Sequence, residues 1–294
     1  MSGRELSADL AKVALSRWSG GYLMTTAALA FLAIGSGIAC WWYMAYLKPV
    51  AGPSLEGVVG YTVMWSLMMA AMMLPTVHRV TALYVMMVRR QDGPFTALLR
   101  IVALLVGYLF IWSVLGIPVY LIGVYVGKLI PYGSVWTVGF TAFLLAGSGL
   151  FQFSAVKERC LHHCQSPMAF VSKHMQRTGW ERDLRAGLAH GLTCLGCCAA
   201  MVAVLIAVGT MNVAWMVILG TIAMIEKTSI HGRNISRIAG IGMMIYSVII
   251  ITYPQLAPAP HGLDGHVHSY LPHAEQFDPQ SQDICGGDYP QPKK

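Results

Sequence analysis

The sequence predicts an all-α, polytopic membrane helix bundle, and three observations support that prediction. Of the 294 residues, 56% are hydrophobic and 11% are charged, and the mean hydropathy is +0.58. The apolar residues gather in about seven runs near the ~20 residues that a helix needs to cross the hydrocarbon core of a bilayer. The basic residues lie between these runs rather than in one patch, which indicates the lipid bilayer as a partner and argues against nucleic acid.

The expected spans follow from these apolar runs. They are 22–47, 57–88, 97–126, 133–156, 186–208, 211–227 and 236–254. The second is longer than a bilayer requires and contains Pro75, whose missing amide hydrogen favours a kink. Its length is also consistent with a helix that runs past the bilayer into the cytosol. The chain then divides into an N-terminal segment, 1–21, a transmembrane helical domain, 22–254, and a polar tail, 255–294.

The distribution of Lys and Arg predicts the orientation. When the spans are threaded in order, 16 of the 20 basic residues fall on the side of the N-terminus and four on the opposite side. Cytoplasmic loops carry the excess of Lys and Arg, so we expect the N-terminus and the loop 157–185 inside and the tail outside. The first apolar run is too long for the core of a signal peptide, so it is expected to be retained as a span.

The fifth expected span carries three thiols on one helix face. Cys194, Cys197 and Cys198 have the spacing i, i+3 and i+4, with His190 a turn before them and Met201 a turn after. Thiolate, imidazole and thioether groups are ligands that copper(I) and zinc prefer. Free cysteines also pack as small buried hydrophobes, which is the competing interpretation. Three of the seven cysteines within five positions favour a metal site.

The second expected span carries a run of methionines before Pro75. They form rows at i, i+4 spacing, and the candidate ligands here are Met69, Met72, Met73 and His78. Methionine adapts to irregular packing, so one interpretation is a face for helix packing. The other is a thioether-lined site or path for copper(I). Both stay open at this point.

Two further thiols follow the fourth expected span. Cys160 and Cys164 have i, i+4 spacing, and they share one face if the helix continues through them. Three thiols on one helix face cannot all reach a metal at tetrahedral angles, so at least one ligand should come from another segment. The candidates are this pair, His78 and the methionines of the second span, and we favour the pair. Glu226, at the end of the sixth span, is a further candidate ligand, or simply an interfacial carboxylate.

The polar tail holds His261, His266, His268, His273 and Cys285. Short His-rich tracts bind copper or zinc, but such a tail can also be simply solvated. The other six cysteines lie in or near apolar runs, so no disulfide scaffold is expected.

Several short motifs carry a resemblance to a known family. The second span holds Trp65 with MMAAMMLP, the fourth leads through GLFQ and Lys157 to Cys164-x-x-Pro167, and HG-x-x-CLGCC begins at His190, followed by G-x-MN-x-x-WM and EK. Over residues 57–230 the chain resembles a bacterial family of predicted metal-binding integral membrane proteins, sometimes labelled copper chaperones. The resemblance implies a copper-binding, multi-pass protein of the bacterial inner (cytoplasmic) membrane. Two departures, Ala199 where the family tends to have Trp and Val156 where it tends to have Pro, affect packing more than ligands.

Three functions are consistent with these features, and none of them is an enzyme's. The first is copper handling, in which the chain holds copper for a membrane metalloenzyme complex or delivers it there. The second is a membrane thiol redox protein, which is weakened by the reducing cytosol and by the lack of an external CxxC. The third is a non-catalytic accessory subunit of a membrane complex. The expected cofactor is a copper ion, with zinc as the alternative.

Overall fold

The computed structural model describes residues 3–46, 54–129, 135–166, 180–210 and 212–256, and every regular element within these ranges is a helix. The α-helices are α1 Gly3–Tyr46, α2 Leu55–Met73, α3 His78–Gln91, α4 Pro94–Leu129, α5 Val135–Phe151, α6 Ala155–Gln165, α8 Trp180–Val208, α9 Val213–Thr228 and α10 Gly232–Thr252, and the short 3-10 helices are η1 Pro75–Val77 and η2 Pro254–Leu256. The predicted all-α class is confirmed.

Five of the described helices are long and apolar enough to cross a membrane. These candidate spans are Gly21–Tyr46, Leu55–Met73, Pro94–Val126, Trp180–Val208 and Gly232–Thr252. The pair α5 and α6, bent by 62° at a short break, adds a sixth if it forms one broken span. With 16 residues, α9 is shorter than a usual crossing. The structure therefore supports five or six spans, and the seventh, at α9, stays a prediction.

Two of the expected spans are interrupted. Pro75 opens η1 and separates α2 from α3, so the predicted kink is a complete break between two helices. The fourth expected span, 133–156, ends at Phe151, and a new helix begins after Ser154, whose hydroxyl accepts a hydrogen bond from the Lys157 amide at 3.2 Å. The fourth expected span is therefore not one straight helix, and its last two residues, 155 and 156, belong to α6. Cys160 and Cys164 still share a helix, because both lie on α6.

Glycines set the closest helix contacts in the bundle. A Cβ added to Gly187 of α8 would lie 2.1 Å from the Leu104 carbonyl oxygen of α4, and one added to Gly107 of α4 would lie 2.3 Å from the Leu184 oxygen of α8. Membrane helices associate closely where small residues let their backbones approach. This contact places α4 directly along α8, the helix with three thiols.

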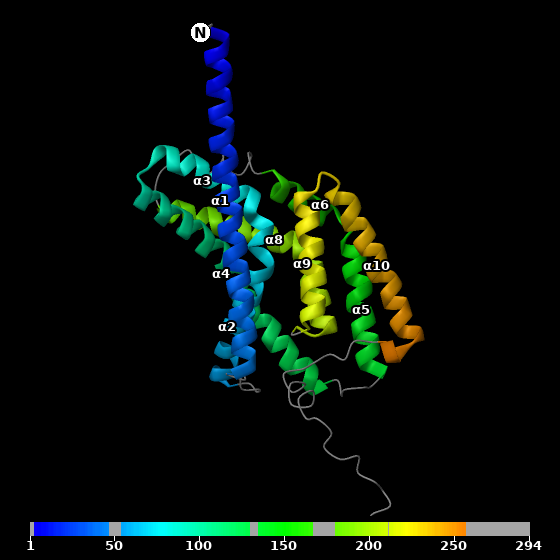
Figure 1. The fold of residues 1–294 in the computed structure, drawn as a ribbon. Coiled ribbons are helices and arrows are strands. Elements are labelled where there is room, and N and C mark those ends of the chain that lie inside the picture. The colour runs from blue at the N-terminus through cyan, green and yellow to red at the C-terminus, as the bar shows by residue number, and fades with distance from the viewer. Residues whose placement is uncertain (1–2, 47–53, 130–134, 167–179, 211, 257–294) are drawn as a thin grey trace, which may run out of the picture.

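In Figure 1, α1, α5, α9 and α10 run roughly up and down the view, and α4 runs obliquely across it. The N-terminal end of α1 and the α9–α10 connection lie toward the top, and the start of α5 and the end of α10 lie toward the bottom. α9 contacts α2 on one side and α10 on the other. Large apolar side chains such as Phe31, which is 76% exposed, cover the outer surface, as expected of a surface that faces lipid.

Two basic side chains near the ends of expected spans are buried. Arg100 of α4 donates from Nε to the Asp183 carboxylate of α8 at 2.7 Å and also pairs with Asp92. Lys157 of α6 is buried against α9. Because burying a charge is costly unless it is paired, both contacts fix helices relative to one another.

Candidate metal centre

The three thiols of α8 point into the bundle. Cys194, Cys197 and Cys198 are each at most 2% exposed. The Cys197 thiol donates to the carbonyl oxygen of Cys194 at 3.1 Å, and its sulfur lies 3.8 Å from that of Cys198. The helical spacing thus produces the common face that the sequence predicts.

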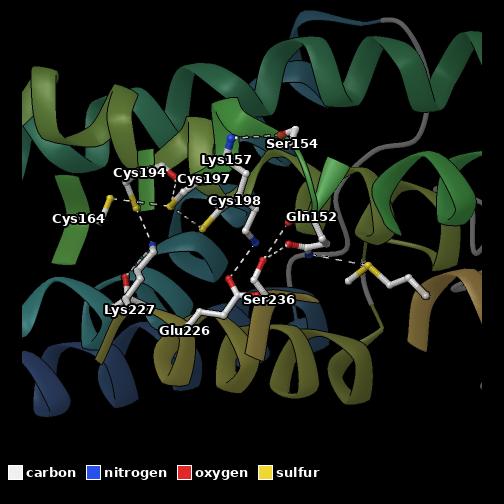
Figure 2. A network of polar contacts seen from close by, with 12 residues as sticks. Gln152, Ser154, Lys157, Cys164, Cys194, Cys197, Cys198, Glu226, Lys227 and Ser236 are labelled. Carbon is white, nitrogen blue, oxygen red and sulfur yellow. Dashed lines mark hydrogen bonds and ion pairs between the residues drawn. The ribbon is translucent and has the colours of Figure 1, made fainter. Parts of the chain in front are cut away.

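The helix α6 brings a fourth thiol to this face. The break after Phe151 directs α6 toward α8, and the Cys164 sulfur lies 3.8 Å from the Cys197 sulfur (Figure 2). The sulfurs of Cys164, Cys194 and Cys197 all lie within 4.8 Å of one another. Two sulfurs that bind one ion at ~2.3 Å and a tetrahedral angle are about 3.8 Å apart, so the three thiols can hold one metal ion with small adjustments. We call these three residues the three-sulfur site.

A buried ammonium group lies beside the three-sulfur site. Lys227 reaches from α9, where its Nζ donates to the Cys194 sulfur at 2.8 Å and to the Thr76 hydroxyl at 3.3 Å (Figure 2). The Tyr108 hydroxyl of α4 lies 3.2 Å from the same sulfur and donates to the Met73 carbonyl at 3.4 Å. The thiolate is the metal-binding form of cysteine, so a fixed cation here offsets the negative charge of a thiolate complex.

Glu226 lies apart from the sulfurs and pairs with a lysine. Its Oε2 accepts from Lys157 Nζ at 2.9 Å, and the two side chains are 2% and 1% exposed. Its second oxygen, Oε1, has no hydrogen-bond partner among the described residues. Gln165, the last residue of α6, donates to the backbone carbonyl of Glu226 at 2.7 Å. Glu226 therefore joins α9 to α6, the helix that carries Cys164.

The two candidate histidines, His190 and His78, are not members of the three-sulfur site. Among the described His, Cys, Asp and Glu side chains, only the three-sulfur site forms a group with metal-binding spacing. The buried ring of His190 lies 5.7 Å from that of Tyr108, measured between centroids. The Nδ1 of His78 lies 2.8 Å from the Pro75 carbonyl oxygen, and its ring contacts Tyr22.

The candidate methionines lie in the same apolar core as the thiols. Met69 and Met73 are buried, and Met72 packs against the core beside Gly220 of α9. Both interpretations of these methionines, packing face and thioether ligands, stay open. The tail residues with His261 and Cys285 lie outside the described residues.

Comparison with known protein families shows which family the chain belongs to. Residues 62–250 match the family described as PpoB2, copper chaperone. The chain belongs to this family. The resemblance expected from the motifs is thus confirmed, and the matched region contains every residue of the three-sulfur site as well as Lys227 and Glu226. No curated protein and no solved structure matches the chain.

The PpoB2-family motifs acquire physical roles in the structure. Trp65 is fully buried, and its indole donates to the Trp112 carbonyl at 2.9 Å, which joins α2 to α4. Gln152, at the end of the GLFQ motif, lies at the break before α6 and accepts from the Ser236 hydroxyl of α10 at 2.9 Å (Figure 2). The EK motif supplies the two buried charges of α9. The departure at Val156 lies on an exposed position, and Ala199 is only partly buried.

Sequence reasoning missed four residues of this PpoB2-family site. Lys227 entered only as part of the EK motif, and in the structure its ammonium points inward to Cys194. Lys157 was expected in a loop, and Tyr108 and Thr76 were not singled out. A signal was present for Lys227, because an ionisable residue at the end of an unusually short span indicates a functional site. The roles of Tyr108 and Thr76 depend on tertiary contacts that spacing alone does not reveal.

Proposed function

We propose that this chain binds copper(I) through Cys164, Cys194 and Cys197 and holds it for, or delivers it to, a membrane metalloenzyme. The observation that carries the proposal is the convergence of three sulfurs from two helices within 4.8 Å of one another. Soft thiolate donors favour copper(I) and zinc, and membership of a copper chaperone family favours copper. The metal is the cargo of the protein and takes part in no catalytic step.

The surroundings of the three-sulfur site support this role. Three thiolates with one copper(I) ion carry a net negative charge, and Lys227 places one positive charge 2.8 Å from Cys194. The Tyr108 hydroxyl adds a polar contact on another side of the same sulfur. The remaining walls are apolar, which excludes water and makes each electrostatic contact stronger than it is in solution.

Copper binding can be tested by the metal content of the purified full-length protein. We expect about one copper(I) per chain after anaerobic loading, and none bound tightly after replacement of Cys164, Cys194 and Cys197 together by Ser, because hydroxyls are poor ligands for a soft metal. Cys40→Ser is the matched control, since Cys40 is buried away from the three-sulfur site. Copper content that is unchanged in the triple variant contradicts the proposal. Stoichiometric zinc or a reversible Cys164–Cys197 disulfide without metal would favour a zinc site or a redox protein instead.

We also propose a bacterial inner-membrane location with the N-terminus and α6 on the cytoplasmic side. The connections between α3 and α4 and between α9 and α10 lie at the same end of the bundle as α6 (Figure 1). This end carries most of the basic residues, as the positive-inside rule requires. The helix α6, which supplies Cys164 to the three-sulfur site, then lies at the cytoplasmic end of the bundle rather than the outer end.

The orientation can be tested with reporter fusions at three positions. Fusions at Gly93 and Arg177 are expected to report the cytoplasm, and a fusion at Gly262 the outside, because the spans between them reverse the direction of the chain. Each position is fused in turn to a reporter active only in the cytoplasm and to one active only outside, so that either location gives a positive signal. The opposite pattern at all three positions would reverse the orientation.

A further inference from the structure

Four side chains on α6 carry atoms that can bind a metal, and they differ in exposure. His162 and His163 are exposed, Cys160 is half-buried, and Cys164 is only 8% exposed. The two other thiols of the three-sulfur site, on α8, are more deeply buried than Cys164. A bulky copper carrier cannot contact the buried sulfurs directly. Copper therefore needs a more exposed ligand that binds it first and passes it to the buried thiols. The α6 helix offers such a ligand in Cys160.

The Cys160 side chain packs against α8, the helix that carries Cys194 and Cys197. Its sulfur is so close to Gly196 of α8 that a Cβ added there would come within 2.8 Å of it. Gly196 precedes Cys197 in the CLGCC block, and Cys160 is one helical turn before Cys164 on α6. The Cys160 thiol therefore lies next to the three-sulfur site without being a member of it.

We propose that Cys160 is the exchange thiol through which copper(I) passes between a soluble thiol-bearing carrier and the three-sulfur site. This inference rests on the proposed function and deepens it. It also assigns a role to Gly196, which leaves the space that the Cys160 sulfur occupies against α8. The carrier is defined by its chemistry alone: it holds copper(I) by thiolates and approaches from the side on which α6 is exposed.

The exchange proceeds by substitution of one sulfur ligand for another. The Cys160 thiol loses its proton as its sulfur bonds to the copper, one bond from copper to a carrier thiolate breaks, and that thiolate takes up the proton through water. Cys164 then displaces the second carrier thiolate in the same way, and Cys197 displaces Cys160, whose thiolate takes up the proton that Cys197 loses. Cys194 bonds last and releases its proton to solvent, so the carrier leaves with both of its thiols protonated. Copper stays monovalent throughout, so the exchange needs no oxidant or reductant.

Loss of Cys160 is expected to change the rate of copper transfer but not the amount of copper bound at equilibrium. Because Cys160 lies outside the three-sulfur site, its loss removes the intermediate ligand and leaves the final ligands in place. We therefore expect Cys160→Ser to bind as much copper(I) at equilibrium as the wild type does. Loading from copper(I)–glutathione, and removal by a copper(I) chelator, are expected to slow by at least roughly tenfold.

The measurement is stopped-flow transfer to and from the purified full chain. Cys40→Ser, which removes a thiol far from α6, serves as the control and is expected to keep the wild-type rate. Wild-type rates in Cys160→Ser would overturn the inference, as would an equilibrium loss of copper in that variant, because Cys160 would then be a permanent ligand. A wild-type chain that binds no copper would instead overturn the proposed function, so the two failures are distinguishable.

A second variant tests the role of Gly196. In Gly196→Ala the new methyl group displaces the Cys160 sulfur from α8, so exchange is expected to slow while the copper content stays at the wild-type value. Gly147→Ala is the matched control, since a Cβ at Gly147 meets nothing within 4 Å. Equal exchange rates in the two alanine variants would show that the Cys160 contact with α8 is not used.

Discussion

Replacing Glu226 by Gln is expected to destabilise the folded chain by about 3–5 kcal/mol, the usual effect of removing one partner of a buried ion pair. The substitution leaves the Lys157 ammonium with no carboxylate in an environment where it is 1% exposed. The loss is measured as the shift in free energy of unfolding in detergent. It should be accompanied by weaker copper binding, because this pair holds the helix that carries Cys164.

The control for this prediction is an exposed ion pair that also involves α6, the helix of Lys157. Glu158 of α6 pairs with Arg233, and the two side chains are 43% and 61% exposed. Glu158→Gln is expected to cost between about 0 and 1 kcal/mol, since water and salt screen exposed pairs. The double variant Lys157→Met with Glu226→Leu removes both buried charges and is expected to recover most of the lost stability. Equal losses at Glu226 and Glu158 would show that burial of the pair does not control its contribution.

The fold was predictable to the extent that apolar runs and prolines define it. Five of the seven expected spans fall mainly on single helices, α1, α4, α8, α9 and α10, and Pro75 follows the end of α2, because a residue without an amide hydrogen cannot continue the ladder. The break between Phe151 and Ala155 was not predicted. The sequence features that mark this break are weak. Ser154 caps α6 and Glu158 lies in its first turn, but the residues just before them are mostly apolar.

The candidate site was predictable on α8, and less so beyond it. Helical periodicity alone places Cys194, Cys197 and Cys198 on one face. The need for a ligand from another segment pointed to Cys160 and Cys164, and the structure brings Cys164 to the α8 thiols. The inward direction of Lys227 could not be read from the sequence, because a lysine at the end of a span reaches inward or outward according to its tertiary partners.

The adjacent cysteines of α8 provide the sharpest test of which sulfurs bind the metal. Both side chains are 1% exposed, yet Cys197 belongs to the three-sulfur site and Cys198 does not. We expect Cys197→Ser to lower copper(I) affinity by at least ~100-fold, since even loss of an outer partner of a metal ligand costs about 10–100-fold. Cys198→Ser is expected to lower the affinity by less than about tenfold, the lower end of that range, because it alters only a neighbour of the site.

Competition with a coloured copper(I) chelator measures both affinities in the folded protein. The two variants match in residue type, helix and burial, so a general loss of packing should affect them alike. Selective loss in Cys197→Ser then reports coordination, because Cys197 is the residue whose sulfur lies 3.8 Å from that of Cys164 on the neighbouring helix. Equal large losses in both variants would instead indicate a four-sulfur site, in which Cys198 moves toward the ion when it binds.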